Sequence, residues 1–308
     1  AARNLIRGRT GAITLAVPTL KAAYLAELAE AVIETARTLD LVVYVTTYPD
    51  DGVRGSRTYL EQFTPQLSDG LLLSMAEHEH LEASDLDVAF PLVCLGSRHT
   101  FAKADRVASD DVIDARTATE YLLERGASSI AVVGAHTPFD ARTIGIAAEG
   151  NAELRLRGVM EAASAAGRAL DPRLVGVTGY DWTIGSGMRA ARAIIDAGVA
   201  FDGLVCLNDG LAIGAISALR ESGLRVPEDV QVIGFDNIDE AAFLTPPLTT
   251  MDSRIEWIAR TALERLVARI EETPTARVDS GRTDDPDAAP PAETLLARSR
   301  LVARGTTR

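Results

Sequence analysis

The sequence predicts an α/β protein built from two consecutive Rossmann-like units with parallel sheets. Its apolar segments are short and continuous, such as 12–17, 41–46 and 204–207. Continuous runs are typical of strands covered on both faces, as they are in parallel sheets. Between these runs, apolar residues recur at steps of three and four, which indicates helices. The 308 residues are enough for one or two domains.

The first half of the chain alternates strands with helices. Residues 12–17 form a strand that Pro18 ends, and the apolar residues of 25–39 recur with a helical period. Further apolar runs predict three more strands and one short helix, at 41–46, 70–73, 91–95 and 59–63.

A second block of the same kind begins near Asp114. The same patterns predict helices at 117–125, 153–166, 187–197 and 209–222, and strands at 130–134, 174–177, 204–207 and 230–234.

The last part of the chain adds a helix, a loop and a strand. Residues 255–270 have an apolar helical face, and 295–303 are predicted to be a final strand. Residues 273–291 are rich in Pro, Asp, Ala and Gly, which predicts a surface loop.

Polar side chains follow two of the strands in the second block. Asn208 and Asp209 follow the run 204–207, and Asp236 and Asn237 follow the strand 230–234. Open parallel sheets bind ligands at the carboxyl ends of their strands. The sequence therefore predicts two groups of ligand-reading side chains close together at one sheet edge.

Three motifs of this region resemble the effector-binding domain of LacI/GalR-family transcription regulators. They are Asn208-Asp209, the segment GLRVPEDVQVIGFDN at 223–237, and LTPPLTT at 244–250. The resemblance implies a periplasmic-binding-protein-like fold of type I, with three crossovers and an effector in the cleft between two lobes. It implies a first lobe of 10–113 plus 252–290, and a second lobe of 114–251 plus 291–308.

The basic segment 1–10 resembles the hinge or linker that follows a helix-turn-helix in this family. No such DNA-reading module precedes it in the sequence, so we expect an effector domain without its DNA reader. A disordered basic terminus is the alternative interpretation.

Four residues of the predicted second lobe match positions where the family contacts its effector. Trp182 would stack on a sugar ring, although it could instead plug the edge of the core. Arg155 lies in an Arg-x-x-Gly motif whose guanidinium would bind effector oxygens, although it could be a solvated helix residue. Asn208 and Asp236 suit neighbouring hydroxyls. Because Asn and Asp also cap helices, we assign the structural, capping role to Asp209 and the ligand role to Asn208.

Two residues of the predicted first lobe complete the candidate site. Tyr24 stands where the family has an aromatic residue, and Ser253 replaces a frequent Gln. Both positions depart from the family's motif, which leaves the identity of the effector open. The segment 135–152 is about ten residues longer than is usual in the family. Its residue Arg142 is a further possible contact.

The composition excludes several classes of protein. The net charge is −13 and the isoelectric point is about 4.8, so the chain itself lacks the basic surface that binds a phosphate backbone. Cys94 and Cys206 lie in apolar runs, which predicts two buried, reduced thiols. No secretory signal and no apolar run of about 18 residues is present, so we expect a cytoplasmic protein.

Signals for an enzyme or a metal site are weak. The run Gly185–Ala190 fits a dinucleotide-binding pattern, but Trp182 and its loop separate it from the preceding strand. There is no G-x-S-x-G motif, and the pair His78 and His80 has no third ligand nearby. We expect no enzyme activity, no cofactor and no metal.

These observations favour the effector-sensing domain of a LacI/GalR-like repressor or other regulator. It would bind a small sugar-like effector, form a homodimer and control operator DNA allosterically. The alternative is the sugar-binding protein of a transporter, which shares the fold. A third possibility, an α/β enzyme, would need a cofactor or nucleophile site.

Overall fold

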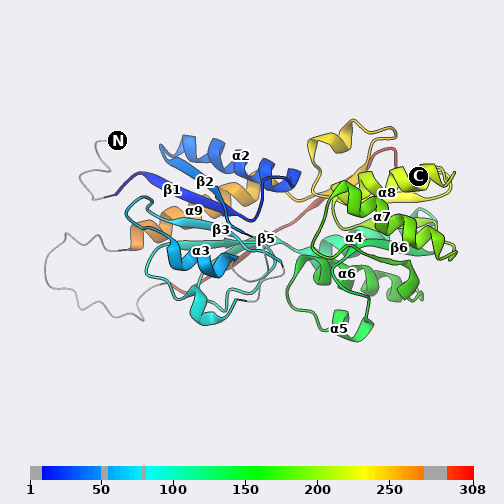
Figure 1. The fold of residues 1–308 in the computed structure, drawn as a ribbon, viewed down its shortest axis with the longest axis horizontal. Coiled ribbons are helices and arrows are strands. Elements are labelled where there is room, and N and C mark those ends of the chain that lie inside the picture. Colours follow the sequence, from blue (N-terminus) through cyan, green and yellow to red (C-terminus); the bar gives the residue numbers. More distant parts are fainter. Residues whose placement is uncertain (1–8, 50–54, 78–80, 274–289) are drawn as a thin grey trace, which may run out of the picture. The chain divides into compact units, whose positions relative to one another are not determined.

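The structure is a computed structural model that describes residues 9–49, 55–77, 81–273 and 290–308 (Figure 1). The chain divides into two compact units. The first unit comprises residues 1–21, 25–108 and 255–297, and the second comprises 22–24, 109–254 and 298–308. Each unit has a six-stranded sheet in its described part.

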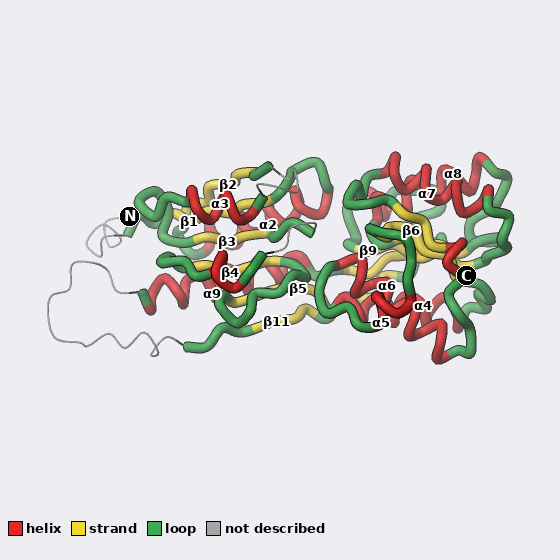
Figure 2. The backbone as a smooth tube through the Cα atoms, turned by 60° about the horizontal axis from the view of Figure 1, so that its bottom comes forward, coloured by secondary structure: helices red, strands yellow, loops and turns green. Residues whose placement is uncertain are grey.

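The sheet of the first unit has the strand order β11-β5-β4-β3-β1-β2. Its pairs from β5 to β2 are parallel, and Ala12 of β1 pairs with Val42 of β2. Figure 2 shows β11 running beside β5. The strands are β1 (Ala12–Val17), β2 (Val42–Thr47), β3 (Leu71–Ser74), β4 (Leu92–Leu95), β5 (Asp105–Ser109) and β11 (Thr294–Ala297). The helices are α2 (Ala23–Thr38), α3 (Ser56–Gln62), η1 (Ala83–Leu86) and α9 (Ile255–Glu272).

The sheet of the second unit has the order β12-β10-β9-β8-β6-β7. All its pairs are parallel except that of β12 with β10. The strands are β6 (Ile130–Ala135), β7 (Val175–Val177), β8 (Gly203–Cys206), β9 (Gln231–Phe235), β10 (Thr249–Asp252) and β12 (Arg300–Val302). The helices are α4 (Asp111–Glu124), α5 (Ala141–Gly145), α6 (Asn151–Ala165), η2 (Pro172–Leu174), α7 (Ile184–Asp196), α8 (Asp209–Glu221) and η3 (Asp239–Ala242).

Glycines allow the helices of the second unit to pack closely in pairs. A Cβ atom at Gly187 of α7 would lie 2.6 Å from the Cα of Leu211 in α8. In return, a Cβ at Gly214 of α8 would lie 2.6 Å from the backbone nitrogen of Met188. Real Cβ atoms do not approach backbone so closely, so only glycine fits at these crossings. The glycine at 187, in the run that fits a dinucleotide-binding pattern, thus serves helix packing.

The predicted α/β class with two parallel-sheet units is confirmed, and the chain passes between the two sheets three times. The single last strand predicted at 295–303 is wrong. Residues 294–297 join the first sheet as β11, and 300–302 join the second as β12. The two short strands have different neighbours. In the first sheet β11 lies beside β5, and in the second sheet β12 pairs antiparallel with β10.

The unit boundaries lie near the lobe boundaries that the resemblance implied. Apart from residues 22–24, which belong to the second unit, the units change at 108/109, 254/255 and 297/298, whereas we predicted 113/114, 251/252 and 290/291. The helix α4 begins at Asp111, six residues before the helix start predicted at 117. Asp110 caps α4 there, since its side chain accepts a hydrogen bond from the backbone of Ile113.

Some predictions fall outside the described residues. These are the hinge remnant over residues 1–8, the pair His78 and His80, and most of the predicted loop at 273–291. Within the described residues, no helix is long and apolar enough to cross a membrane.

Candidate functional site

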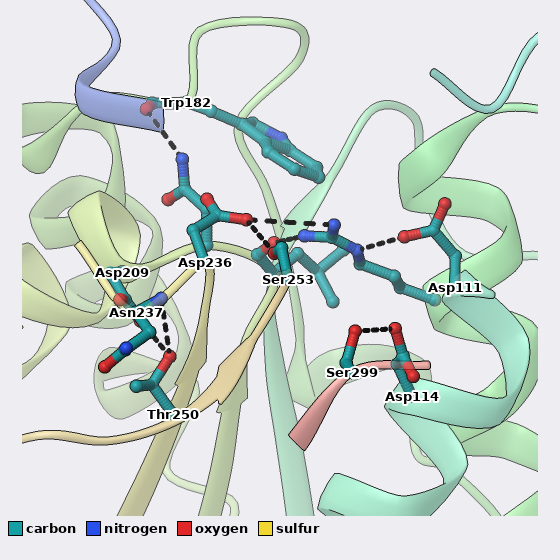
Figure 3. A network of polar contacts seen from close by, with 12 residues as sticks. Asp111, Asp114, Trp182, Asp209, Asp236, Asn237, Thr250, Ser253 and Ser299 are labelled. Atoms are coloured by element: carbon teal, nitrogen blue, oxygen red, sulfur yellow. Dashed lines mark hydrogen bonds and ion pairs between the residues drawn. The ribbon is translucent and has the colours of Figure 1, made fainter. Parts of the chain in front are cut away.

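Four neighbouring parallel strands of the second unit end in polar side chains. In sheet order, β10 is followed by Ser253, β9 by Asp236, β8 by Leu207 and then Asn208, and β6 by His136. Because the pairs β10-β9, β9-β8 and β8-β6 are all parallel, these ends share one edge of the sheet. This carboxyl edge is the candidate site, and Figure 3 shows its polar network.

Arg155 lies at the centre of this network. It comes from α6 and is buried, with 7% of its surface exposed. Its Nε donates to Oδ1 of Asp111 at 2.7 Å, and Nη1 donates to the carbonyl of Leu207. Its Nη2 lies 4.0 Å from Oδ1 of Asp236. Burial alone would lower the pKa of Arg155, but Asp111 and Asp236 outweigh it and raise the pKa, so the guanidinium stays charged.

Asp236 faces Arg155 from the end of β9. Its Oδ1 accepts a hydrogen bond from Oγ of Ser253 at 3.2 Å. Burial raises the pKa of Asp236, while Arg155 and Ser253 oppose that rise. The backbone φ of Asp236 is 104°, which is unusual for a residue other than glycine. Asp236 adopts this conformation where its carboxylate turns toward the guanidinium of Arg155; a dashed line from Asp236 marks the contact in Figure 3.

Asp209 is a structural residue, as predicted, but it does not cap the helix. Its buried carboxylate accepts hydrogen bonds from Oγ1 of Thr250 at 2.7 Å and from the backbone of Ile238 at 3.0 Å. Burial, and then the charge of Asp236, raise its pKa well above the usual value. Asp209 therefore ties the start of α8 to the segments after β9 and in β10.

Asn208 takes the capping role that we had assigned to its neighbour. Its Oδ1 accepts a hydrogen bond from the backbone of Leu211 at 2.7 Å and so caps α8. The capping oxygen must belong to the residue just outside the helix, and α8 begins at Asp209. The amide Nδ2 donates to the carbonyl of Trp182 at 3.3 Å. A role in ligand binding remains a prediction for Asn208.

Trp182 is anchored at this edge. Its Nε1 donates to the carbonyl of Gly134 at 2.9 Å, and its ring packs against the core of the second unit. The guanidinium carbon of Arg155 lies 5.8 Å from the ring centroid. In the view of Figure 3 the indole of Trp182 is drawn above the side chains of Asp236 and Ser253. Because its polar atom is already bonded, Trp182 can offer a ligand a fixed apolar surface.

The sequence analysis missed His136 and Glu153. Nδ1 of His136 lies 3.2 Å from Oε1 of Glu153, and the imidazole is 5.6 Å from the ring of Trp182. Tyr180 also contacts His136, with its ring centroid 4.3 Å from that of the imidazole. His136 directly follows β6 and Glu153 lies two residues before Arg155, so the strand-end pattern could have identified both.

The structure brings five of the six predicted residues into one edge: Arg155, Trp182, Asn208, Asp236 and Ser253. Tyr24, in the first turn of α2, belongs with residues 22–24 to the second unit. Burial, and then the charge of Asp236, raise its pKa, while Arg155 opposes the rise, so Tyr24 also interacts with this network. Its contact with a ligand remains a prediction. In the segment 135–152, Arg142 is exposed within the short helix α5. Over the described residues there is no cluster of His, Cys, Asp and Glu that could hold a metal ion.

Comparison with known proteins gives the family. Residues 119–307 match the family of periplasmic binding protein-like domains. The chain is 29% identical over 310 residues to the ribose operon repressor of Halalkalibacterium halodurans, covering 100% of this chain and 82% of that protein. A LacI-type transcription regulator from Bifidobacterium animalis subsp. lactis is 32% identical, with a TM-score of 0.86 and coverage of 96% and 99%. The transcriptional regulator CelR in complex with cellobiose is 26% identical, with a TM-score of 0.78 and coverage of 97% and 85%.

These relatives are transcriptional regulators and not enzymes. They favour a regulatory domain over the sugar-binding component of a transporter, which was the alternative interpretation of the sequence.

Proposed function

Because the chain belongs to the LacI-type transcription regulators and contains their periplasmic binding protein-like domain, we propose that it senses a small sugar-like effector. The effector binds at the carboxyl edge of the second unit's sheet, and binding controls attachment of the regulator to operator DNA. The chain performs no chemistry on the effector and needs no cofactor.

The observation that carries this proposal is the convergence of different polar groups on Arg155. Asp236 supplies acceptors, and Arg155 has donors on Nη1 and Nη2 beyond those used in its contacts with Asp111 and Leu207. At the end of the neighbouring strand β8, the amide of Asn208 has one N–H left beyond its bond to Trp182. A sugar hydroxyl both donates and accepts, so adjacent hydroxyls match an Arg–Asp pair. The ring of Trp182 adds the apolar surface on which a sugar face stacks.

The names of two relatives support the same class of effector. One relative is a repressor of a ribose operon, and another was solved with cellobiose. One is a pentose system and the other a disaccharide, so the shared feature is a polyhydroxylated ring. We therefore propose this class for the present chain without choosing one sugar.

The regulatory mechanism is a shift between two conformational populations. An effector changes operator affinity only to the extent that it binds one conformation more tightly than the other. Arg155 is suited to this role, since it bonds both α4, through Asp111, and the end of β8, through Leu207. An effector that draws the guanidinium toward itself would change both contacts. We further propose a homodimer acting in the cytoplasm, where the operator DNA is.

A thermal-shift screen tests the binding step. The panel holds pentoses, hexoses, disaccharides, their phosphate esters and nucleosides. A ligand at about 100 times its dissociation constant should add about 2.7 kcal/mol to the free energy of unfolding. A gel-shift assay of the regulator on its own promoter, with and without the hit, then tests operator control. If no panel sugar stabilises the chain, the proposed effector class is wrong.

Variants of Asn208 separate its two roles. Asn208→Asp keeps a capping oxygen for α8 but lacks the amide donor, so stability should be kept while effector affinity falls. Asn208→Ala should lose both, with a loss of about 1 kcal/mol in stability. Equal effector affinity in Asn208→Asp and the wild type would show that Asn208 is a cap alone.

A further inference from the structure

The charges of the carboxyl edge are unbalanced. Arg155 supplies a positive charge, and it already contacts Asp111 and approaches Asp236. Asp209 adds a third buried carboxyl group, which accepts hydrogen bonds from neutral donors: the hydroxyl of Thr250 and the backbone of Ile238 and Asn237. One guanidinium is therefore set against three buried carboxyl groups at this edge.

The side of the site near Trp182 carries a further carboxylate. Glu153 is partly exposed, and its Oε1 lies 3.2 Å from Nδ1 of His136. The imidazole in turn lies 5.6 Å from the ring of Trp182. Glu153 thus adds a carboxylate beside His136, on the Trp182 side of the carboxyl edge.

The geometry of Arg155 sets how close an anion must come to Asp236. An oxygen bonded to Nη2 lies about 2.8 Å from that nitrogen. Since Nη2 is 4.0 Å from Oδ1 of Asp236, the oxygen and the carboxylate are at most about 7 Å apart. In a buried site such like charges repel strongly. A neutral hydroxyl has no such penalty, and it can also donate to Asp236.

We propose that the effector carries no phosphate or carboxylate group, and that Asp236 and Glu153 are the residues that exclude anionic effectors. This inference rests on the proposed function, and it narrows the effector to neutral or amino sugars. Glu153 acts by its charge from behind His136, whereas Asp236 also bonds the effector directly.

Paired ligands provide the test. Isothermal titration calorimetry would compare each neutral sugar that binds, such as ribose, glucose or cellobiose, with its terminal phosphate ester. The wild type should prefer the neutral member by at least about 100-fold, the size expected for burying an unpaired like charge. Asp236→Asn and Glu153→Gln should each narrow this ratio by about ten-fold, because each removes one negative charge without changing side-chain shape. Asp236→Asn should also lower the affinity for the neutral sugar, whereas Glu153→Gln should leave that affinity unchanged.

Glu240→Gln is the matched control, since Glu240 is exposed in η3, four residues beyond Asp236. It removes the same charge and should leave the ratio unchanged. Ligand-free melting of each variant shows that it is folded.

Each outcome decides one statement. If a phosphate ester binds as tightly as its neutral sugar, the inference is overturned while the proposed function stands. An unchanged ratio in both Asp236→Asn and Glu153→Gln would overturn the role of these residues. If no member of any pair binds, the proposed function itself fails, and the inference with it.

Discussion

Replacing Asp111 by alanine should destabilise the second unit by about 3 kcal/mol, because it strips a buried arginine of its closest carboxylate. Asp111 is 2% exposed and Arg155 is 7% exposed, and the two bond at 2.7 Å. Removal of one partner of a buried ion pair costs about 3–5 kcal/mol, since the other charge stays buried. Arg155 keeps the Leu207 carbonyl and Asp236 at 4.0 Å, so the lower end of that range applies.

Urea unfolding followed by tryptophan fluorescence measures this loss. The chain has two tryptophans, Trp182 in the second unit and Trp257 in α9 of the first. A Trp257→Phe background leaves Trp182 as the reporter of the second unit. At a slope of about 2–3 kcal/mol per molar urea, the midpoint should fall by about 1 M or more.

The control comes from an exposed ion pair on the same helix. Arg116 and Glu120 of α4 also approach to 2.8 Å, but their side chains are 51% and 43% exposed. Glu120→Ala should therefore leave the midpoint unchanged within error, since exposed pairs contribute little. If Asp111→Ala and Glu120→Ala shift the midpoint equally, the Arg155 network does not stabilise the unit as described.

Two further predictions concern the same unit. Burial, and in smaller part Asp111, raise the pKa of Asp114 to about 6, against the opposing hydrogen bond from Ser299. The folded state then holds this proton more tightly than the unfolded chain, so stability should fall by up to about 3 kcal/mol as pH rises from about 4 to about 6. Asp114→Asn should remove that part of the slope while the exposed Glu124→Gln keeps it, and equal slopes in denaturant titrations would refute the assignment. Gly187→Ala should cost about 2 kcal/mol by forcing a Cβ against α8, whereas Gly185→Ala, whose nearest contact is a flexible arginine tip, should cost far less in the same titration.

Strand positions in the sheets could be predicted where burial is uniform. Strands such as β1 and β8 are fully buried, and their unbroken apolar runs show this directly. The strand β5 escaped prediction because its sequence, Asp-Arg-Val-Ala-Ser, begins with two charged residues. Asp105 is nevertheless fully buried, since Arg265 and Arg269 of α9 bond its carboxylate at 3.1 and 2.9 Å. Partners 160 residues away neutralise it, and no local pattern reports them.

The site could be predicted in part for a similar reason. Strand-end position and resemblance predicted that Asp236 and Asn208 lie at the carboxyl edge, because the local sequence defines both positions. The sequence could not show which of Asn208 and Asp209 caps α8, since the answer depends on the exact first residue of that helix. The contact of His136 with Glu153 joins the end of β6 to α6 across 17 residues and required the fold.

The most direct test of the central claim is calorimetric titration of the sugar that best stabilises the wild type. It would be titrated into Trp182→Ala and Asp236→Ala, with the exposed Phe243→Ala and Glu240→Gln as matched controls. If the effector binds at the carboxyl edge of the second unit, both site variants should lose at least about ten-fold in affinity for the sugar, while both controls bind it like the wild type. Wild-type affinity in Trp182→Ala and Asp236→Ala would show that the effector binds elsewhere.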